Sequence, residues 1–174
     1  MRGKGFVSSG ITIRNRIIIV TLLIILIVFI RFLYFYGKSK AFSTIPKDGN
    51  MKFTVQFYSA NLIQNNSVGN KWSFEVKING KKIKEGRKLK ITATTKETIS
   101  FSASAKENDF IPDTGAGSIN VKIVDLKLVE NNTYPIDVTV AENKGMYKGN
   151  TAIWKFNFIV TRKVSLLDII NNIF

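Results

Sequence analysis

The sequence predicts an all-β fold, an antiparallel β-sandwich of seven to eight strands, preceded by one N-terminal transmembrane helix and followed by a short C-terminal helix. A dense apolar run at residues 17–36 predicts the first helix. From residue 51 onward, hydrophobic side chains recur at every second position, which is the period of a half-buried strand. No helical pattern separates these segments, so the sheets are expected to be antiparallel.

The chain has room for only one folded domain. Of its 174 residues, 1–16 form a basic tail, 17–36 the transmembrane helix and 37–50 a linker rich in Gly, Ser and Thr. Residues 51–174 are long enough for a single hydrophobic core. We therefore expect one β domain attached to the membrane by one helix.

The membrane segment satisfies the length requirement of a bilayer. Residues 17–30 contain no charge, and twenty residues at about 1.5 Å each span about 30 Å. Arg31 is near enough to one end to extend its guanidinium to the lipid headgroups. Tyr34 and Tyr36 are expected to lie at the membrane interface, where aromatic residues with a polar group are enriched.

The distribution of charge predicts the orientation of the helix. Four basic residues and no acid precede it, which favours a cytoplasmic N-terminus and an extracytoplasmic domain. A cleaved signal peptide is the alternative, because Ala41-Phe42-Ser43 has the small residues of a cleavage site. The aromatic residues between the apolar run and this site favour an uncleaved signal anchor instead.

The strand pattern also indicates where the chain turns. Asn79-Gly80 is typical of a two-residue hairpin loop, and a change of phase near Val124–Asp125 suggests a β-bulge before Leu126 and Leu128. Apolar positions in the expected strands alternate as Phe53, Val55, Phe57; Trp72, Phe74, Val76, Ile78; Leu89, Ile91, Ala93; Ile99, Phe101, Ala103, Ala105; Ile119, Val121, Ile123; Ile136, Val138, Val140; and Ala152, Trp154, Phe156, Phe158, Val160.

A short helix is expected at the C-terminus. Ser165 and Asp168 have the spacing of a helix N-cap and its capping box, and the apolar residues that follow fall on one helical face. Its expected role is to close an open end of the sandwich, with docking to a partner as the alternative.

The composition removes most familiar catalytic schemes. The chain has no Cys and no His, which excludes disulfides, Cys-based zinc sites and catalysis by either side chain. A Ser-Lys pair is the common nucleophile scheme that is left, and the alternation places Ser102, Ser104 and Lys106 on the outer face of a strand, where polar residues are expected in any case. We predict neither an enzyme nor a bound cofactor.

The positive charge of the domain is concentrated in one segment. The chain carries a net charge of +14, and residues 71–96 hold nine basic residues against two acids. Such a cluster attracts anionic lipids or polymers, whereas lysines on an edge strand can also serve only to prevent aggregation. Nucleic acid is disfavoured by the extracytoplasmic location. The residues expected to bind an anionic partner are Lys77, Lys81, Lys82, Lys84, Arg87, Lys88 and Lys90.

One acidic loop is a weak candidate for calcium. Glu107, Asp109 and Asp113 could supply several of the oxygen ligands that Ca²⁺ takes, although they match no EF-hand pattern. A sandwich with an acidic loop distantly resembles calcium-and-lipid-binding domains of the C-two type, and an Ig-like arrangement is equally compatible with the strand pattern. An ordinary solvated turn is favoured over a metal site.

The function expected from these features is that of a membrane-anchored, extracytoplasmic binding or assembly module of the cell envelope. Its partners would be the lipid bilayer, an anionic lipid or cell-wall polymer, or an envelope protein. The alternatives are an enzyme or enzyme accessory acting on an envelope substrate, and a calcium-dependent lipid-binding domain.

Overall fold

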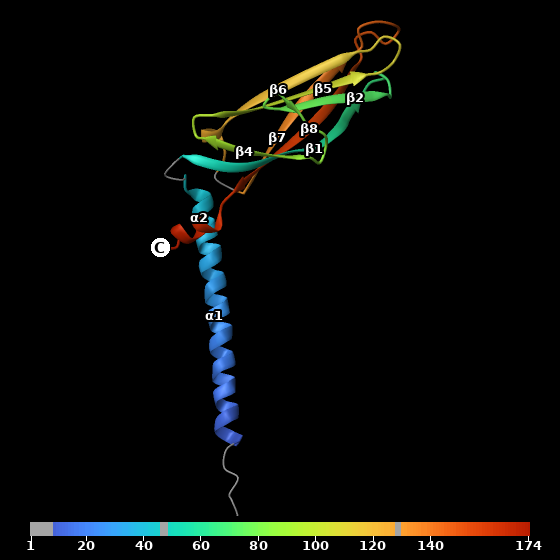
Figure 1. The fold of residues 1–174 in the computed structure, drawn as a ribbon. Helices are drawn as coiled ribbons and strands as arrows, with labels where there is room; N and C mark the ends of the chain where they lie inside the picture. Colours follow the sequence, from blue (N-terminus) through green and yellow to red (C-terminus); the bar gives the residue numbers. More distant parts are fainter. Residues whose placement is uncertain (1–8, 46–48, 128–129) are drawn as a thin grey trace, which may run out of the picture. The chain divides into compact units, whose positions relative to one another are not determined.

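The computed structural model describes residues 9–45, 49–127 and 130–174, with side chains from residue 14 onward (Figure 1). The chain divides into two compact units. One unit combines the N-terminal helix α1, up to Ala41, with the C-terminal residues 165–174. The other unit, residues 42–164, contains all the β-strands.

Helix α1 is longer than the sequence predicted. It spans Ser9–Ser43, which is 35 residues or about 52 Å, and it includes a segment that is long and apolar enough to cross a membrane. Residues 37–43 were expected to begin the linker but are helical. A glycine inside a helix costs only about 1 kcal/mol relative to alanine, so Gly37 alone does not end the helix.

Gly37 instead allows the second helix to pack against α1. A Cβ at Gly37 would lie 2.6 Å from Cγ1 of Ile173 and 2.7 Å from the carbonyl oxygen of Ile169. Helix α2 spans Leu166–Asn171 and begins with the predicted capping box, in which the Ser165 hydroxyl accepts from the Asp168 N–H and the Asp168 carboxylate accepts from the Ser165 N–H. Within this unit α2 therefore packs against α1, and its expected role in closing an open end of the sandwich stays a prediction.

The β unit consists of two antiparallel four-stranded sheets, as the alternation predicted. Sheet A has the strand order β4-β1-β8-β7, and sheet B has the order β3-β2-β5-β6. The strands of sheet A are β4 (Lys88–Thr94), β1 (Asn50–Asn65), β8 (Thr151–Lys163) and β7 (Asn131–Ala141); those of sheet B are β3 (Lys81–Lys82), β2 (Trp72–Ile78), β5 (Thr98–Glu107) and β6 (Thr114–Lys122).

The two turn predictions had different outcomes. Asn79 and Gly80 have φ angles of 48° and 75° and join β2 to β3, as the hairpin signal indicated. The predicted bulge near Val124–Asp125 is wrong, because Ile123–Asp125 form a 3₁₀ helix, η1, that ends β6. The phase change therefore marks the point where the chain leaves sheet B. Leu128 lies outside the described residues.

Aromatic side chains fill the space between the sheets. Phe101, Phe156 and Phe158 are fully buried, and the rings of Phe101 and Phe158 have centroids 4.8 Å apart. Phe57 adds a further ring, 5.7 Å from Phe158. These contacts join β1 and β8 of sheet A to β5 of sheet B.

The sandwich is closed along the side formed by β6 and β7. Gly115 and Gly117 face inward on β6 and lie against the backbone and side chains of β7. A Cβ at Gly115 would lie 2.1 Å from the carbonyl oxygen of Thr139. The two sheets can approach this closely only because β6 has no side chain at that position.

Candidate functional site

The basic segment is divided between two sheets. Lys77, Lys81 and Lys82 belong to the β2–β3 hairpin of sheet B, whereas Lys88 and Lys90 belong to β4 of sheet A. Lys84 and Arg87 are exposed in the connection between β3 and β4. Because β3 and β4 are the edge strands of their sheets, several of these cations also protect strand edges.

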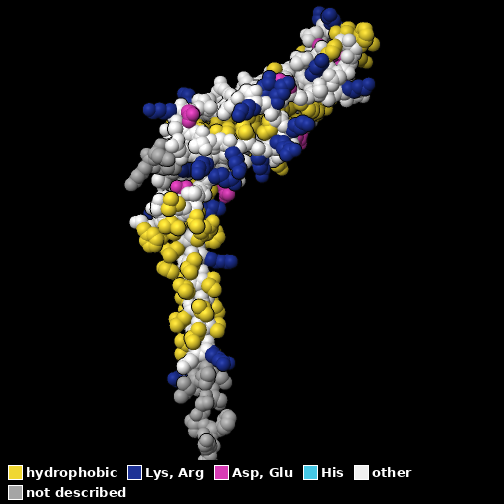
Figure 2. Space-filling view, viewed as in Figure 1, with side chains coloured by type: hydrophobic (Ala, Val, Ile, Leu, Met, Phe, Trp, Pro, Cys, Tyr) yellow, Lys and Arg dark blue, Asp and Glu magenta, His cyan; other side chains and the backbone are white. Residues whose placement is uncertain are grey.

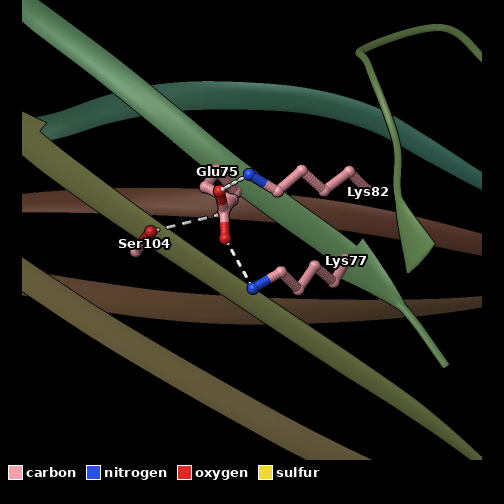
Figure 3. Close-up of polar contacts among 4 residues, drawn as sticks. All are labelled: Glu75, Lys77, Lys82 and Ser104. Carbon is pink, nitrogen blue, oxygen red and sulfur yellow. Dashed lines mark hydrogen bonds and ion pairs between the residues drawn. The ribbon is translucent and has the colours of Figure 1, made fainter. Parts of the chain in front are cut away.

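Two of the predicted anion-binding lysines contact an acid of their own strand pair. The Nζ atoms of Lys77 and Lys82 contact the two carboxylate oxygens of Glu75, the Lys77 contact being 2.5 Å (Figure 3). The Ser104 hydroxyl from β5 donates a long hydrogen bond of 3.4 Å to the Glu75 carbonyl oxygen. This half of the basic segment is therefore partly neutralised, which the sequence did not reveal.

The two lysines favour the ionised form of Glu75. Hydrogen bonds from Lys77 and then Lys82 lower the pKa of Glu75 from 4.5 to about 2. A lowered pKa in the folded state stabilises the fold above pH 4.5, and this contribution is lost as the pH falls toward 2. The effect is small because the three side chains are at least a third exposed.

The ion pairs can be tested by titration. We expect the carboxyl carbon of Glu75 to titrate near pH 2 in a nuclear magnetic resonance experiment. In Lys82→Gln the midpoint should rise, because one of the two cations that favour the carboxylate is removed. An unchanged midpoint in this variant would show that Lys82 does not contact Glu75 in solution.

The outer face of sheet A brings together four lysines that are separated in the sequence. The register aligns Lys52 of β1 with Lys163 of β8, and Lys88 and Lys90 of β4 with Gln56 and Thr54 of β1. All four lysines are exposed. Sequence reasoning found Lys88 and Lys90 but missed Lys52 and Lys163, because strand pairing over more than 100 residues leaves no local signal.

These lysines have little acidic compensation. Asp137 is the only acid among the described residues of this face. Its Oδ1 lies 3.9 Å from Nζ of Lys155. Lys52 and Lys163 are directly opposite, an arrangement of like charges that destabilises a sheet. Figure 2 shows dark-blue Lys and Arg side chains spread over the sandwich, with few magenta acids between them.

The candidate calcium ligands form hydrogen bonds within the β unit. Asp113 is buried, and its Oδ1 accepts hydrogen bonds from the backbone N–H of Asn143 at 3.2 Å and from its side-chain amide at 2.7 Å. Glu107 accepts from the Asp109 N–H, and burial raises the pKa of Glu107. Within the described parts of the chain, no three carboxylates converge in a manner that could hold a metal ion.

Sheet B carries a shallow hollow of about 470 Å³ on its outer face, next to Glu75. Lys77 lies opposite Ser102, and Glu75 lies opposite Ser104. Catalysis by a Ser-Lys pair requires an unprotonated lysine beside the serine, whereas Lys77 is engaged by the Glu75 carboxylate. This arrangement suits an ion pair better than a nucleophile.

The residues predicted for the membrane interface lie in the C-terminal half of α1. Arg31, Tyr34 and Tyr36 are all exposed on the helix surface, and Lys40 Nζ lies 4.9 Å from the centre of the Tyr36 ring. Their placement at the headgroup level stays a prediction.

The sequence matches no protein-family model and no curated protein.

Proposed function

We propose that the protein is a membrane-anchored, extracytoplasmic module that binds phosphate-bearing anions of the envelope through the outer face of sheet A. The observation that carries this proposal is the group of four exposed lysines on three adjacent strands, Lys52, Lys88, Lys90 and Lys163. An anion bound between Lys52 and Lys163 would relieve their mutual repulsion.

The helical unit supports the membrane anchor. The apolar side chains of α1 between Ile17 and Ile30 are about half exposed, which is unfavourable in water and favourable in lipid. Helix α2 and the residues after it add an apolar surface, since Leu166 and Leu167 of α2 are about two-thirds exposed and Phe174, beyond its end, is fully exposed.

The chain connections favour headgroups or polymers close to the anchoring membrane. Only six residues, 44–49, separate the end of α1 from β1, and they span at most about 22 Å. Lys52 lies at the beginning of β1 and Lys163 at the end of β8, so both are near the points where the chain enters and leaves the β unit. Each lysine near an anionic membrane contributes about 1 kcal/mol.

The proposal is tested with four simultaneous substitutions, Lys52, Lys88, Lys90 and Lys163→Gln, in the full chain held in neutral nanodiscs. We expect binding to acidic phosphatidylglycerol vesicles to weaken by more than tenfold at low salt, since tenfold requires only about 1.4 kcal/mol. Salt at about 0.5 M should have the same effect on the parent, because the screening length falls to about 4 Å. A soluble glycerol-phosphate polymer in place of vesicles distinguishes a polymer ligand from a lipid one.

The matched control carries the same change at four exposed lysines elsewhere on the β unit, Lys106, Lys122, Lys144 and Lys148. It alters the net charge of the chain equally but leaves the face of sheet A intact. Equal loss of binding in both quadruple variants would show that only total charge matters, and the proposed site would be rejected.

A further inference from the structure

Half of strand β1 has a free edge. Strand β4 pairs with β1 only from Asn50 to Gln56. At the next residue, the Gly86 N–H donates a hydrogen bond to the carbonyl oxygen of Phe57. Beyond that point, residues 58–65 pair with β8 on one side and, among the described residues, with no strand on the other. Alternate residues of this segment therefore direct backbone N–H and C=O groups away from β8.

Unlike the edge strands β3 and β4, the free edge of β1 is not protected against pairing with another chain. Strands β3 and β4 carry lysines at their edges, which prevent pairing with other chains. Residues 58–65, Tyr-Ser-Ala-Asn-Leu-Ile-Gln-Asn, contain neither a charge nor a proline. Two irregularities, at Phe57/Ser59 and Leu62/Gln64, bound a regular run at residues 59–62, which limits the register that an added strand could adopt.

A partly exposed aromatic cluster lies beside this edge, between the two sheets. Leu62 of β1 is paired with Trp154 of β8, and Phe74 of β2 packs on Trp154 with ring centroids 4.5 Å apart. Leu62 and Phe74 are each 41% exposed. On its edge toward β3, strand β2 has no strand partner among the described residues before Val76, because β3 pairs only with its last two residues and the Ile83 N–H donates to the Val76 carbonyl oxygen.

The cluster contains unmet hydrogen-bonding capacity. The indole N–H groups of Trp72 and Trp154 are buried and, among the described residues, have no acceptor. A buried donor without an acceptor costs about 1–3 kcal/mol. An oxygen acceptor brought between the sheets would remove this cost.

From these features we infer that the free edge of β1, at residues 58–65, binds an extended peptide strand by β-augmentation. The backbone edge supplies main-chain hydrogen bonds, and every second side chain of the peptide points toward Leu62, Phe74 and Trp154. The preferred peptide is uncharged, with apolar residues at alternate positions, because residues 58–65 carry no charge and the side chains of Leu62, Phe74 and Trp154 are apolar or aromatic. This site is separate from the lysine face and does not depend on the proposed function.

The experiment uses the full chain in neutral nanodiscs and a fluorescein-labelled heptapeptide in which valine alternates with serine. We expect saturable binding by fluorescence anisotropy. A second heptapeptide, methylated at the backbone nitrogens that would pair with β1, should bind at least tenfold more weakly, because it retains the side chains but not the donors. This comparison needs no change in the protein.

A pair of matched variants locates the site. Leu62→Lys places a charge beside the aromatic cluster and should weaken peptide binding at least tenfold. Thr139→Lys places the same charge at an exposed position of β7, on the closed side of the sandwich, and should bind as the parent does. Near-ultraviolet circular dichroism of the tryptophans verifies that both variants are folded.

Equal affinity for the two heptapeptides, or no saturation up to about 1 mM, would overturn the inference. So would a parent dimer that binds no peptide and dissociates on Leu62→Lys, because the edge would then belong to a second copy of the chain.

Discussion

Replacing Gly115 with valine is expected to unfold the β unit or to destabilise it by at least about 4 kcal/mol, at the upper end of single substitutions. The new Cβ would lie 2.1 Å from the carbonyl oxygen of Thr139, a backbone atom that can move only if β7 moves. Since a domain of this size has about 5–15 kcal/mol of stability, the loss is large. Urea unfolding followed by tryptophan fluorescence measures it.

The control is the next residue of the same strand. Ala116 is exposed on the outer face of sheet B, so Ala116→Val creates the same side chain on the solvent side of the strand and should change the stability by less than about 0.5 kcal/mol. Similar losses for the two variants would mean that β6 and β7 are not closely packed in solution.

The second large effect is expected at Arg162, which is buried inside the β unit at the end of β8. Its Nη1 donates a hydrogen bond to the carbonyl oxygen of Phe42, and its Nη2 donates to that of Thr44 at 2.5 Å. Hydrogen bonds from a charged donor contribute about 1.5–3 kcal/mol each. Arg162→Leu should therefore destabilise the β unit by about 3–5 kcal/mol.

Arg162→Leu should also expose the segment near Phe42 and Thr44 to limited proteolysis, because the guanidinium no longer holds it against β8. Arg162→Lys should be intermediate, since one ammonium cannot reproduce the forked geometry of two donors. Lys163→Gln, at the exposed neighbouring position, serves as the control and should be at least as stable as the parent, because it also removes the like-charge pair with Lys52. If Arg162→Leu were cleaved near Phe42 and Thr44 no faster than the parent, the guanidinium would not be what holds this segment against β8.

The location of the strands could be predicted because each strand has its own alternation of apolar and polar residues in the sequence. Phe101, Ala103 and Ala105 alternate with serines, and Asn79-Gly80 supplies the positive φ angles that its turn needs. The pattern near Asp125 was misinterpreted because a bulge and a departing 3₁₀ turn both shift the alternation by one residue. Likewise, Gly37 was read as the start of a linker, although its role depends on a helix 130 residues later.

The candidate sites depended on contacts that no local pattern encodes. Lys77 shares a face of β2 with Glu75 because it is two residues away, whereas Lys82 reaches Glu75 only through the pairing of β2 with β3. Asp113 accepts hydrogen bonds from Asn143, which lies 30 residues away, and the sequence gives no sign of this contact.

The sequence by itself determined that this protein has one long apolar helix, an alternating β domain and a basic surface without Cys or His chemistry. These properties follow from composition and from periods of two or 3.6 residues, which act over short distances along the chain. The tertiary structure decided which lysines share a face, that β6 closes against β7 through Gly115, and that none of the described strands covers the outer edge of β1 at residues 58–65. Those features arise from the register between distant strands, which is set by how the whole core packs.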